Sequence, residues 1–207
     1  ADATGDQLLT AVSLGEILGH NGSRMMVFSS GSSGQAFLQN HTVSGGAVVH
    51  PELILPAALK DEIYRNIGAP PESGKPNTKQ NDWAARAFLH YGTASDGPLV
   101  SAIWFSDPDG TAHSDGIGSP RAIKSIQAVD EQLGNIIRVL ESKDFLSSYN
   151  IIITADHGFV TQKGKIGLEE FFIKQGLKKD ASSDDLIVAG NAVYVKNHDR
   201  DVTRRIV

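Results

Sequence analysis

The sequence predicts an α/β fold with a mostly parallel sheet flanked by helices on both faces. A capped helical segment at 13–20 runs into a short apolar strand at 25–28. Further along, an apolar strand at 99–105 is followed by a long helical stripe at 119–142 and a third apolar run at 150–154. The order strand, helix, strand implies a right-handed crossover between two parallel strands.

The first predicted helix begins at a capping box. In the segment 13–16, we expect the Ser13 hydroxyl to accept a hydrogen bond from the Glu16 amide and the glutamate side chain to accept one from the Ser13 amide. Asn21-Gly22 ends this helix, because both residue types tolerate the left-handed conformation. The run from Met25 to Phe28 then has the composition of a buried strand.

The next stretch predicts a loop, a hairpin and two helices. The small-residue loop 29–34 fits a plain turn better than its alternative, an anion cradle at a helix N-terminus. Residues 41–49 surround Ser44-Gly45-Gly46 and predict a hairpin. The segments 56–67 and 80–90 have helical patterns and are separated by a surface loop rich in Pro, Gly and Asn.

The second half of the chain gives stronger patterns. Residues 99–105 are mostly apolar, as in a strand buried on both faces of a parallel sheet. Ser119 caps the long helix, Pro120 occupies its first turn, and an apolar stripe from Ile123 to Leu140 predicts packing on the sheet. Later elements are expected as a strand at 150–154, a helix at 168–175, a hairpin at 186–195 and a helical segment at 201–207 that is interrupted in mid-turn.

Composition restricts the kind of protein. The 207 residues fit one domain or at most two, and we expect a single α/β domain across residues 1–207. With 40% hydrophobic and 21% charged residues, the chain has the composition of a folded, soluble protein. Because it contains no cysteine, thiolate metal sites and cysteine nucleophiles are excluded, and any metal is left to His, Asp or Glu.

Charge and hydropathy exclude two further classes. The formal net charge of −5 provides no cationic field for a phosphate backbone, so we expect no nucleic acid polymer as partner. The most apolar stretch, 98–105, falls far short of the roughly 20 residues that span a bilayer, so we expect no transmembrane segment. The chain opens without a basic region or apolar core, so we expect no signal peptide in it. The compartment stays open, with periplasm and secretion both compatible with the parent protein.

Two polar clusters directly follow the last two predicted parallel strands. Asp107, Asp109 and His113 follow the strand at 99–105, and Asp156-His157 follows the strand at 150–154. In open α/β sheets the carboxyl ends of the strands carry the ligand site, so the two clusters are expected at one edge. Carboxylate and imidazole together suit zinc, iron or manganese, and two such pairs suit two ions.

Each cluster also has a structural interpretation. Asp107 and Asp109 around Pro108 fit an Asx-type turn at a strand end, with His113 as a surface residue. Asp156-His157-Gly158 fits a turn in which the glycine supplies a positive φ. The placement of both clusters after successive strands favours the metal interpretation over these two.

The chain resembles the type I phosphodiesterase/nucleotide pyrophosphatase family of the alkaline phosphatase superfamily, from about residue 8 to residue 207. The resemblance lies in four segments: Asp109-Gly110-Thr111-Ala112-His113, the Ser119-Pro120 helix start, Val129 to Gly134, and Asp156-His157-Gly158. It implies an alkaline phosphatase-like core. One departure is Ala112, where the family more often has Gly, which alters the local turn without removing a ligand.

The resemblance also implies a metal centre. Asp109 and His113 would bind one divalent ion and Asp156 and His157 a second, usually zinc, with manganese as the alternative. In the family a further Asp and a Thr or Ser nucleophile complete the second site and a later His completes the first, and we identify none of these three here. We therefore expect a fragment of a longer catalytic domain, with an incomplete site, its nucleophile upstream and no activity by itself.

The activity implied for the parent protein is hydrolysis of small-molecule phosphate mono- or diesters. It would proceed by in-line attack of a metal-activated hydroxyl, a covalent phospho-enzyme, and hydrolysis by metal-bound water. Thr10, Ser13, Ser29 and Ser30 are rejected as substitute nucleophiles, because Ser13 is explained as a helix cap and the others as ordinary loop residues. A non-catalytic α/β binding domain, and a phosphonate or sulfate ester hydrolase of the same superfamily, stay open as alternatives.

The other conspicuous side chains are interpreted as structural. Lys163 and Lys165 fit a solvated loop better than a contact to substrate phosphate. Trp83 and Trp104 are core candidates, and Asp130 fits a structural role before a catalytic one. The remaining histidines lack a partner at ligand spacing: His20, His41, His50, His90 and His198.

Overall fold

A computed structural model describes residues 9–160, 167–189 and 192–207 of the chain. The chain divides into two compact units, Ala1–Val160 and Thr161–Val207, which are described separately. These are units of compactness, so the single domain expected across residues 1–207 stays a prediction. Lys163 and Lys165, which we interpreted as loop residues, lie outside the described residues.

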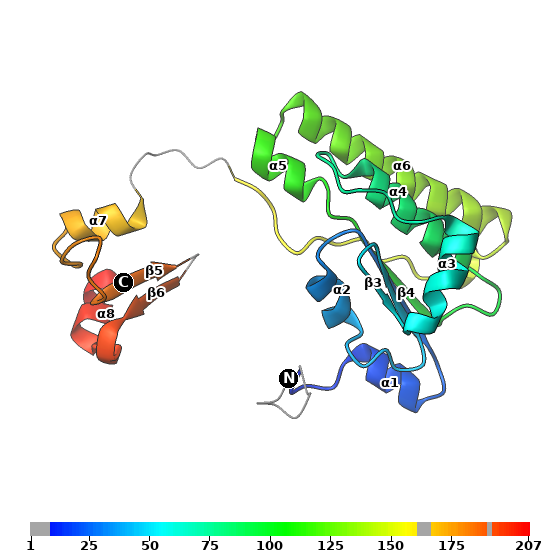
Figure 1. The fold of residues 1–207 in the computed structure, drawn as a ribbon, viewed down its shortest axis with the longest axis horizontal. Helices are drawn as coiled ribbons and strands as arrows, with labels where there is room; N and C mark the ends of the chain where they lie inside the picture. The colour runs from blue at the N-terminus through cyan, green and yellow to red at the C-terminus, as the bar shows by residue number, and fades with distance from the viewer. Residues whose placement is uncertain (1–8, 161–166, 190–191) are drawn as a thin grey trace. The chain divides into compact units, whose positions relative to one another are not determined.

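The first unit contains both helices and strands (Figure 1). Its strands are β1 (Met25–Ser29), β2 (Ala47–His50), β3 (Leu53–Leu55) and β4 (Val100–Trp104). Its α-helices are α1 (Leu14–His20), α2 (Ser33–Gln39), α3 (Lys60–Ile67), α4 (Thr78–Ala87), α5 (Asp109–Asp115) and α6 (Pro120–Ser142). Shorter turns of helix are η2 (Ala57–Leu59), η3 (Phe88–Gly92), which is a π-helix, and η4 (Leu146–Ser148).

The four strands form one mixed sheet in the order β3-β2-β1-β4. Strand β1 pairs in parallel with β2 and with β4, whereas β2 and β3 are antiparallel. The register places Val27 of β1 opposite Val48 of β2 and Ala102 of β4. The predicted α/β fold with a mostly parallel sheet is confirmed.

Side chains of β1 alternate between two separate apolar cores. Met25 and Val27 pack with Ala36 of α2 on one face of the sheet. Phe28 packs on the other face with a larger group from α3, α4 and α6: Ile63, Ile67, Trp83, Ala84, Ala87, Ile136 and Leu140. Because a strand directs successive side chains to opposite faces, β1 fixes helices on both sides of the sheet, as predicted.

Two predicted helix caps are confirmed. The Glu16 amide donates to Ser13 Oγ at 3.3 Å, and the Ser13 amide donates to Glu16 Oε2 at 2.8 Å, so α1 begins at a complete capping box. At the start of α6 the Ala122 amide donates to Ser119 Oγ at 3.1 Å, with Pro120 in the first turn. These caps satisfy backbone amides that have no partner within a helix.

The hairpin predicted at 41–49 is wrong. Residues 40–46 form turns closed by the amides of Val43 and Gly46, and β2 then runs parallel to β1. A side chain at Gly46 would collide with the backbone of Met25, so glycine permits the close approach that starts this parallel pairing. The antiparallel hairpin here is instead β2–β3.

The strand predicted at 150–154 is also wrong. No strand forms at these residues, and Ile152 and Ile153 are 86% and 71% exposed. An apolar run becomes a strand only by pairing, and within the described residues β4 pairs with β1 alone. The expected parallel crossover is therefore not formed, and the residues of β4 are half-buried rather than buried on both faces.

Two core predictions hold only in part. The stripe of α6 is buried at Ile136 and Leu140, but Ile123 and Ile126 near its start are 46% and 54% exposed. The part of α6 that joins this apolar core is thus its second half. Trp83 is fully buried, whereas Trp104 at the end of β4 is only half-buried.

The second unit has its own small set of elements. They are α7 (Leu168–Lys174), β5 (Leu186–Ala189), β6 (Ala192–Val195), η5 (Lys196–His198) and α8 (Arg200–Ile206), with β5 and β6 antiparallel. The expected helix, hairpin and terminal helical segment are confirmed. Buried Lys178 donates to the carbonyls of Ser183 and Leu186, which ties the turn after α7 to β5. In the described parts of both units, we find no helix with the length and hydropathy needed to cross a membrane.

Candidate functional site

Helix α5 starts five residues after β4 ends and carries two of the predicted ligands. Asp109 is its first residue and His113 follows at i+4, so both side chains leave the same face of the helix. Because β4 is parallel to β1, this helix begins at the carboxyl-end edge of the parallel strands. Asp109 and His113 therefore lie at the sheet edge where the sequence predicts them.

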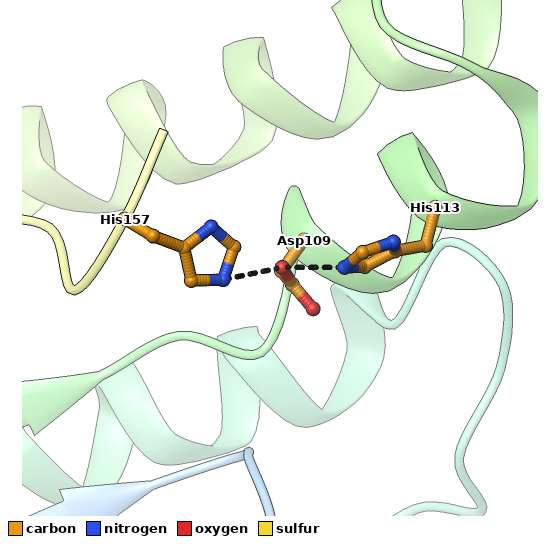
Figure 2. Close-up of side chains that lie close together, drawn as sticks. All are labelled: Asp109, His113 and His157. Atoms are coloured by element: carbon orange, nitrogen blue, oxygen red, sulfur yellow. Dashed lines mark ion pairs between the residues drawn. The ribbon is translucent and has the colours of Figure 1, made fainter. Parts of the chain in front are cut away.

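Three ligand atoms converge at this edge. The Oδ1 atom of Asp109 lies 3.4 Å from Nε2 of His113 and 3.3 Å from Nε2 of His157. All three atoms lie within 4.8 Å of one another. Figure 2 shows the carboxylate between the two imidazole rings, one from α5 and the other from the segment that follows α6.

The Asp109 carboxylate has an oxygen whose hydrogen-bonding capacity is unused. Oδ1 is buried, and no donor among the described residues reaches it with hydrogen-bond geometry. The separations of 3.3 and 3.4 Å also exceed the range of about 2.7 to 3.2 Å usual for N–H···O bonds. A buried carboxylate oxygen without a partner is costly, and a cation between it and the two imidazoles would remove that cost.

The tautomer of His157 supports the same conclusion. Its Nδ1 lies 3.0 Å from the Gly158 carbonyl oxygen, which only accepts, so Nδ1 carries the hydrogen. In the neutral ring, Nε2 is then left with a lone pair that faces Asp109 Oδ1. Histidines that bind metals commonly donate their second nitrogen to a carbonyl in this way.

The environment of His157 favours a positive charge at this position. The pKa of His157 is raised above its ordinary value, chiefly by the hydrogen bond to the Gly158 carbonyl and then by the negative charge of Asp156, with a smaller contribution from Asp109. A proton on Nε2 therefore serves the same electrostatic purpose as a metal ion. The two are expected to compete for one position.

An aromatic ring completes the surroundings of the two histidines. The Phe159 ring packs edge-on against His113 at 4.9 Å and against His157 at 5.2 Å between ring centroids. The two imidazoles themselves are 6.4 Å apart by the same measure. Phe159 therefore provides an apolar contact that restricts the orientation of both rings.

Asp156, the fourth predicted ligand, stands outside this group. It is exposed; its Oδ1 accepts from the His157 amide at 2.9 Å, and its Oδ2 lies 3.7 Å from His157 Nε2. The structure thus brings Asp109, His113 and His157 together and, among the described residues, places Asp156 beside His157 and outside that group.

The sequence interpretation missed a buried polar network behind the site. The interpretation of Ser29 and Ser30 as ordinary loop residues is wrong, because Ser29 ends β1 and both are buried. Ser30 Oγ donates to Asn81 Oδ1 and accepts from the Ser106 amide at 3.0 Å. Their position at the end of a parallel strand could have revealed them. The rule that ligand sites lie at the carboxyl ends of parallel strands, which located Asp109, applies to them as well.

The structural role expected for His50 agrees with the structure. His50 is buried at the end of β2, where Nε2 lies 2.7 Å from the Gly31 carbonyl and Nδ1 accepts from the Glu52 amide. Both ring nitrogens are thereby used within the protein. Asp130 of α6 is exposed, so its structural role stays a prediction.

The fold and the site together define an α/β protein with an Asp/His group capable of holding a cation at the carboxyl-end edge of its sheet. The sequence profile of the type I phosphodiesterase / nucleotide pyrophosphatase family matches residues 30–206. The chain belongs to this family.

Individual relatives match over shorter stretches. Ectonucleotide pyrophosphatase/phosphodiesterase family member 7 of Homo sapiens is 27% identical over 130 residues, which is 61% of this chain and 26% of the relative. Family member 3 of Mus musculus is 36% identical over 64 residues, or 31% of this chain and 7% of the relative. Venom phosphodiesterase of Naja atra is 36% identical over 61 residues, which is 30% of this chain and 7% of the relative.

The chain therefore spans about a quarter or less of the length of these relatives. No solved structure matches it.

Proposed function

We propose that this chain is the metal-binding part of a hydrolase that cleaves small-molecule phosphate mono- or diesters, in the manner of nucleotide pyrophosphatases and phosphodiesterases. Family membership over residues 30–206 supports the reaction class. The observation that carries the proposal is that Asp109 Oδ1 faces two imidazole nitrogens and has no hydrogen-bond donor among the described residues. Carboxylate with imidazole is a donor set suited to zinc or manganese.

The four predicted ligands divide between two divalent ions in this proposal. Asp109 and His113 hold the first ion, and Asp156 and His157 hold the second. His157 also faces Asp109, which supports two ions sharing one small region. When bound, such ions supply Lewis-acid stabilisation of the phosphate oxygens and activation of a hydroxyl.

The chain's own residues contribute orientation. The i, i+4 spacing on α5 presents Asp109 and His113 on one face before any ion arrives. The Gly158 carbonyl fixes the His157 tautomer, so that Nε2 is the nitrogen offered to the site. The Asp156 carboxylate next to it adds negative charge that attracts a cation.

We expect the 207-residue chain by itself to turn over no phosphate ester. The residues assigned to the site are ligands, and none of them is a hydroxyl nucleophile. Ser13 is used as a helix cap, and Ser29 and Ser30 are buried in hydrogen bonds. The full-length protein is the form expected to hydrolyse an aryl phosphate ester in zinc or manganese, and Asp156→Ala should abolish that activity.

The proposal is tested by titrating the 207-residue chain with Zn²⁺ in a calorimeter. Binding is expected for the unaltered chain, and Asp109→Asn is expected to lose the ion held by Asp109 and His113. Asp115→Asn is the matched control, because Asp115 ends the same helix and pairs with Arg121 at 2.9 Å. Equal binding by the unaltered chain and Asp109→Asn would remove the basis of the proposal.

A further inference from the structure

Helix α5 has a second functional face, opposite the one that carries the ligands. Thr111 lies between Asp109 and His113, two residues from each, and is fully buried. With 3.6 residues per turn, a residue two positions along points about 200° away. The short helix therefore presents its ligands on one side and is anchored to the protein on the other.

The anchor is a buried carboxylate at the start of the helix. Asp107 is 2% exposed, and its Oδ1 accepts from both the amide and the hydroxyl of Thr111, each at 2.9 Å. Its Oδ2 accepts from the amide of Asn77, the residue that precedes α4. A single side chain thus joins the first turn of α5 to the start of α4.

This carboxylate is buried without a cationic partner within the described part of the chain. It lies instead where the free amides of two helix starts point, and those amides carry partial positive charge. A buried carboxylate is retained only where hydrogen bonds compensate its loss of water. The three donors from Thr111 and Asn77 provide that compensation.

The same junction is tied to the sheet. Asn81 of α4 accepts from Ser30 at the end of β1, and Asn77 Nδ2 donates to Ser106 Oγ after β4 at 3.0 Å. The Ser106 amide in turn donates to Ser30 Oγ. Of the three parallel strands, β1 and β4 are thus connected to Asp107 through neighbouring hydrogen bonds, so the position of α5 is fixed relative to the sheet.

We propose that Asp107 and Thr111 are positioning residues that hold Asp109 and His113 in ligand geometry, rather than ligands themselves. The inference rests on the proposed metal site. Asp107 uses both carboxylate oxygens on internal donors, whereas Asp109 Oδ1 has no hydrogen-bond donor among the described residues. Loss of an outer partner of this kind commonly costs about 10- to 100-fold in metal affinity.

The test is a titration of the 207-residue chain with Co²⁺, whose visible absorption reports its coordination. Thr111→Val keeps the shape of the side chain and the amide hydrogen bond but removes the hydroxyl donor to Asp107. We expect its Co²⁺ dissociation constant to rise about tenfold with an altered spectrum, and Thr111→Ser to restore both. Asp107→Asn should weaken binding as well, and Asp115→Asn at the other end of α5 should not.

The outcomes separate this inference from the proposed function. If the unaltered chain binds Co²⁺ and Thr111→Val binds it equally well with the same spectrum, the positioning role is overturned while the metal site stands. Equal weakening in Thr111→Val and Thr111→Ser also overturns it, because the hydroxyl is then not the relevant group. If the unaltered chain binds no Co²⁺, the metal site fails, and the positioning role fails with it.

Discussion

Helix α5 and the segment 150–159 bring ligands to the same place, yet the protein holds them in different ways. The start of α5 is fastened by buried side chains at Asp107 and Thr111 and by hydrogen bonds to α4. Residues 150–158 are all exposed and form no helix or strand. Asp109 and His113 are therefore pre-organised by the fold, whereas Asp156 and His157 depend on local contacts.

This difference has a consequence for metal binding. A ligand on an ordered helix loses little conformational freedom when a cation arrives, but a ligand on an exposed segment must be ordered at that moment. The contacts that restrain His157 are the Gly158 carbonyl and the ring of Phe159. The α5 pair is expected to contribute more to affinity than the His157 side.

Amide hydrogen exchange should give the largest contrast between the two regions. The Thr111 amide donates to a buried carboxylate, and we expect it to exchange slower than the amides of Ile152 and Ile153 by orders of magnitude. NMR of the metal-free chain measures this directly. Comparable protection at Ile152 would show that this segment is paired as a strand after all.

Removal of each histidine sharpens the comparison. We expect His113→Ala to weaken zinc binding by more than the roughly 10- to 100-fold expected for loss of an outer partner, since it removes a pre-organised ligand. His157→Ala should weaken zinc binding less. The conformational entropy lost when its segment becomes ordered offsets part of the affinity that the His157 ligand contributes. Dissociation constants measured by calorimetry show which variant loses more zinc affinity. A larger loss in His157→Ala than in His113→Ala would contradict this prediction.

The pH dependence of zinc binding should report His157. Zinc requires the neutral imidazole, so its affinity should fall as pH drops below the raised pKa of His157. In Asp156→Asn the pKa should move down toward its ordinary value, because one negative charge is removed while the Gly158 hydrogen bond stays. The pH at which binding is lost should therefore shift downward; an unchanged midpoint would argue against Asp156 acting on His157.

The smallest effect is expected on stability. Ile152→Ser changes an exposed side chain, so the free energy of unfolding should change by no more than about 0.5 kcal/mol. Denaturant unfolding of the two proteins measures it. A loss of 2 kcal/mol or more, of the size seen when buried apolar side chains are cut back, would mean that the strand predicted at 150–154 exists.

The sequence predicted those parts of the fold that depend on local signals. The capping box at Ser13, the Ser119-Pro120 start of α6 and the strand at Met25 follow from short-range patterns. The same is true of the i, i+4 pair on α5, since helical spacing alone places Asp109 and His113 together.

The errors concern long-range pairing. Val48 pairs with Val27 across a parallel ladder, a partner that the glycines at 45–46 do not reveal. The apolar run at 150–154 has the right composition for a strand but has no partner among the described residues. The polar network around Asp107 was missed for a related reason, because its members come from β1, α4 and the end of β4.

The most direct test of the metal site is a crystal structure of the 207-residue chain with zinc, located by its anomalous scattering. We predict one zinc ion on Asp109 Oδ1 and His113 Nε2 and a second on His157 Nε2 and Asp156, at about 2.0 to 2.2 Å from each ligand atom. Zinc held only by other side chains, or no ion at Asp109 and His113 at saturating zinc, would contradict the account.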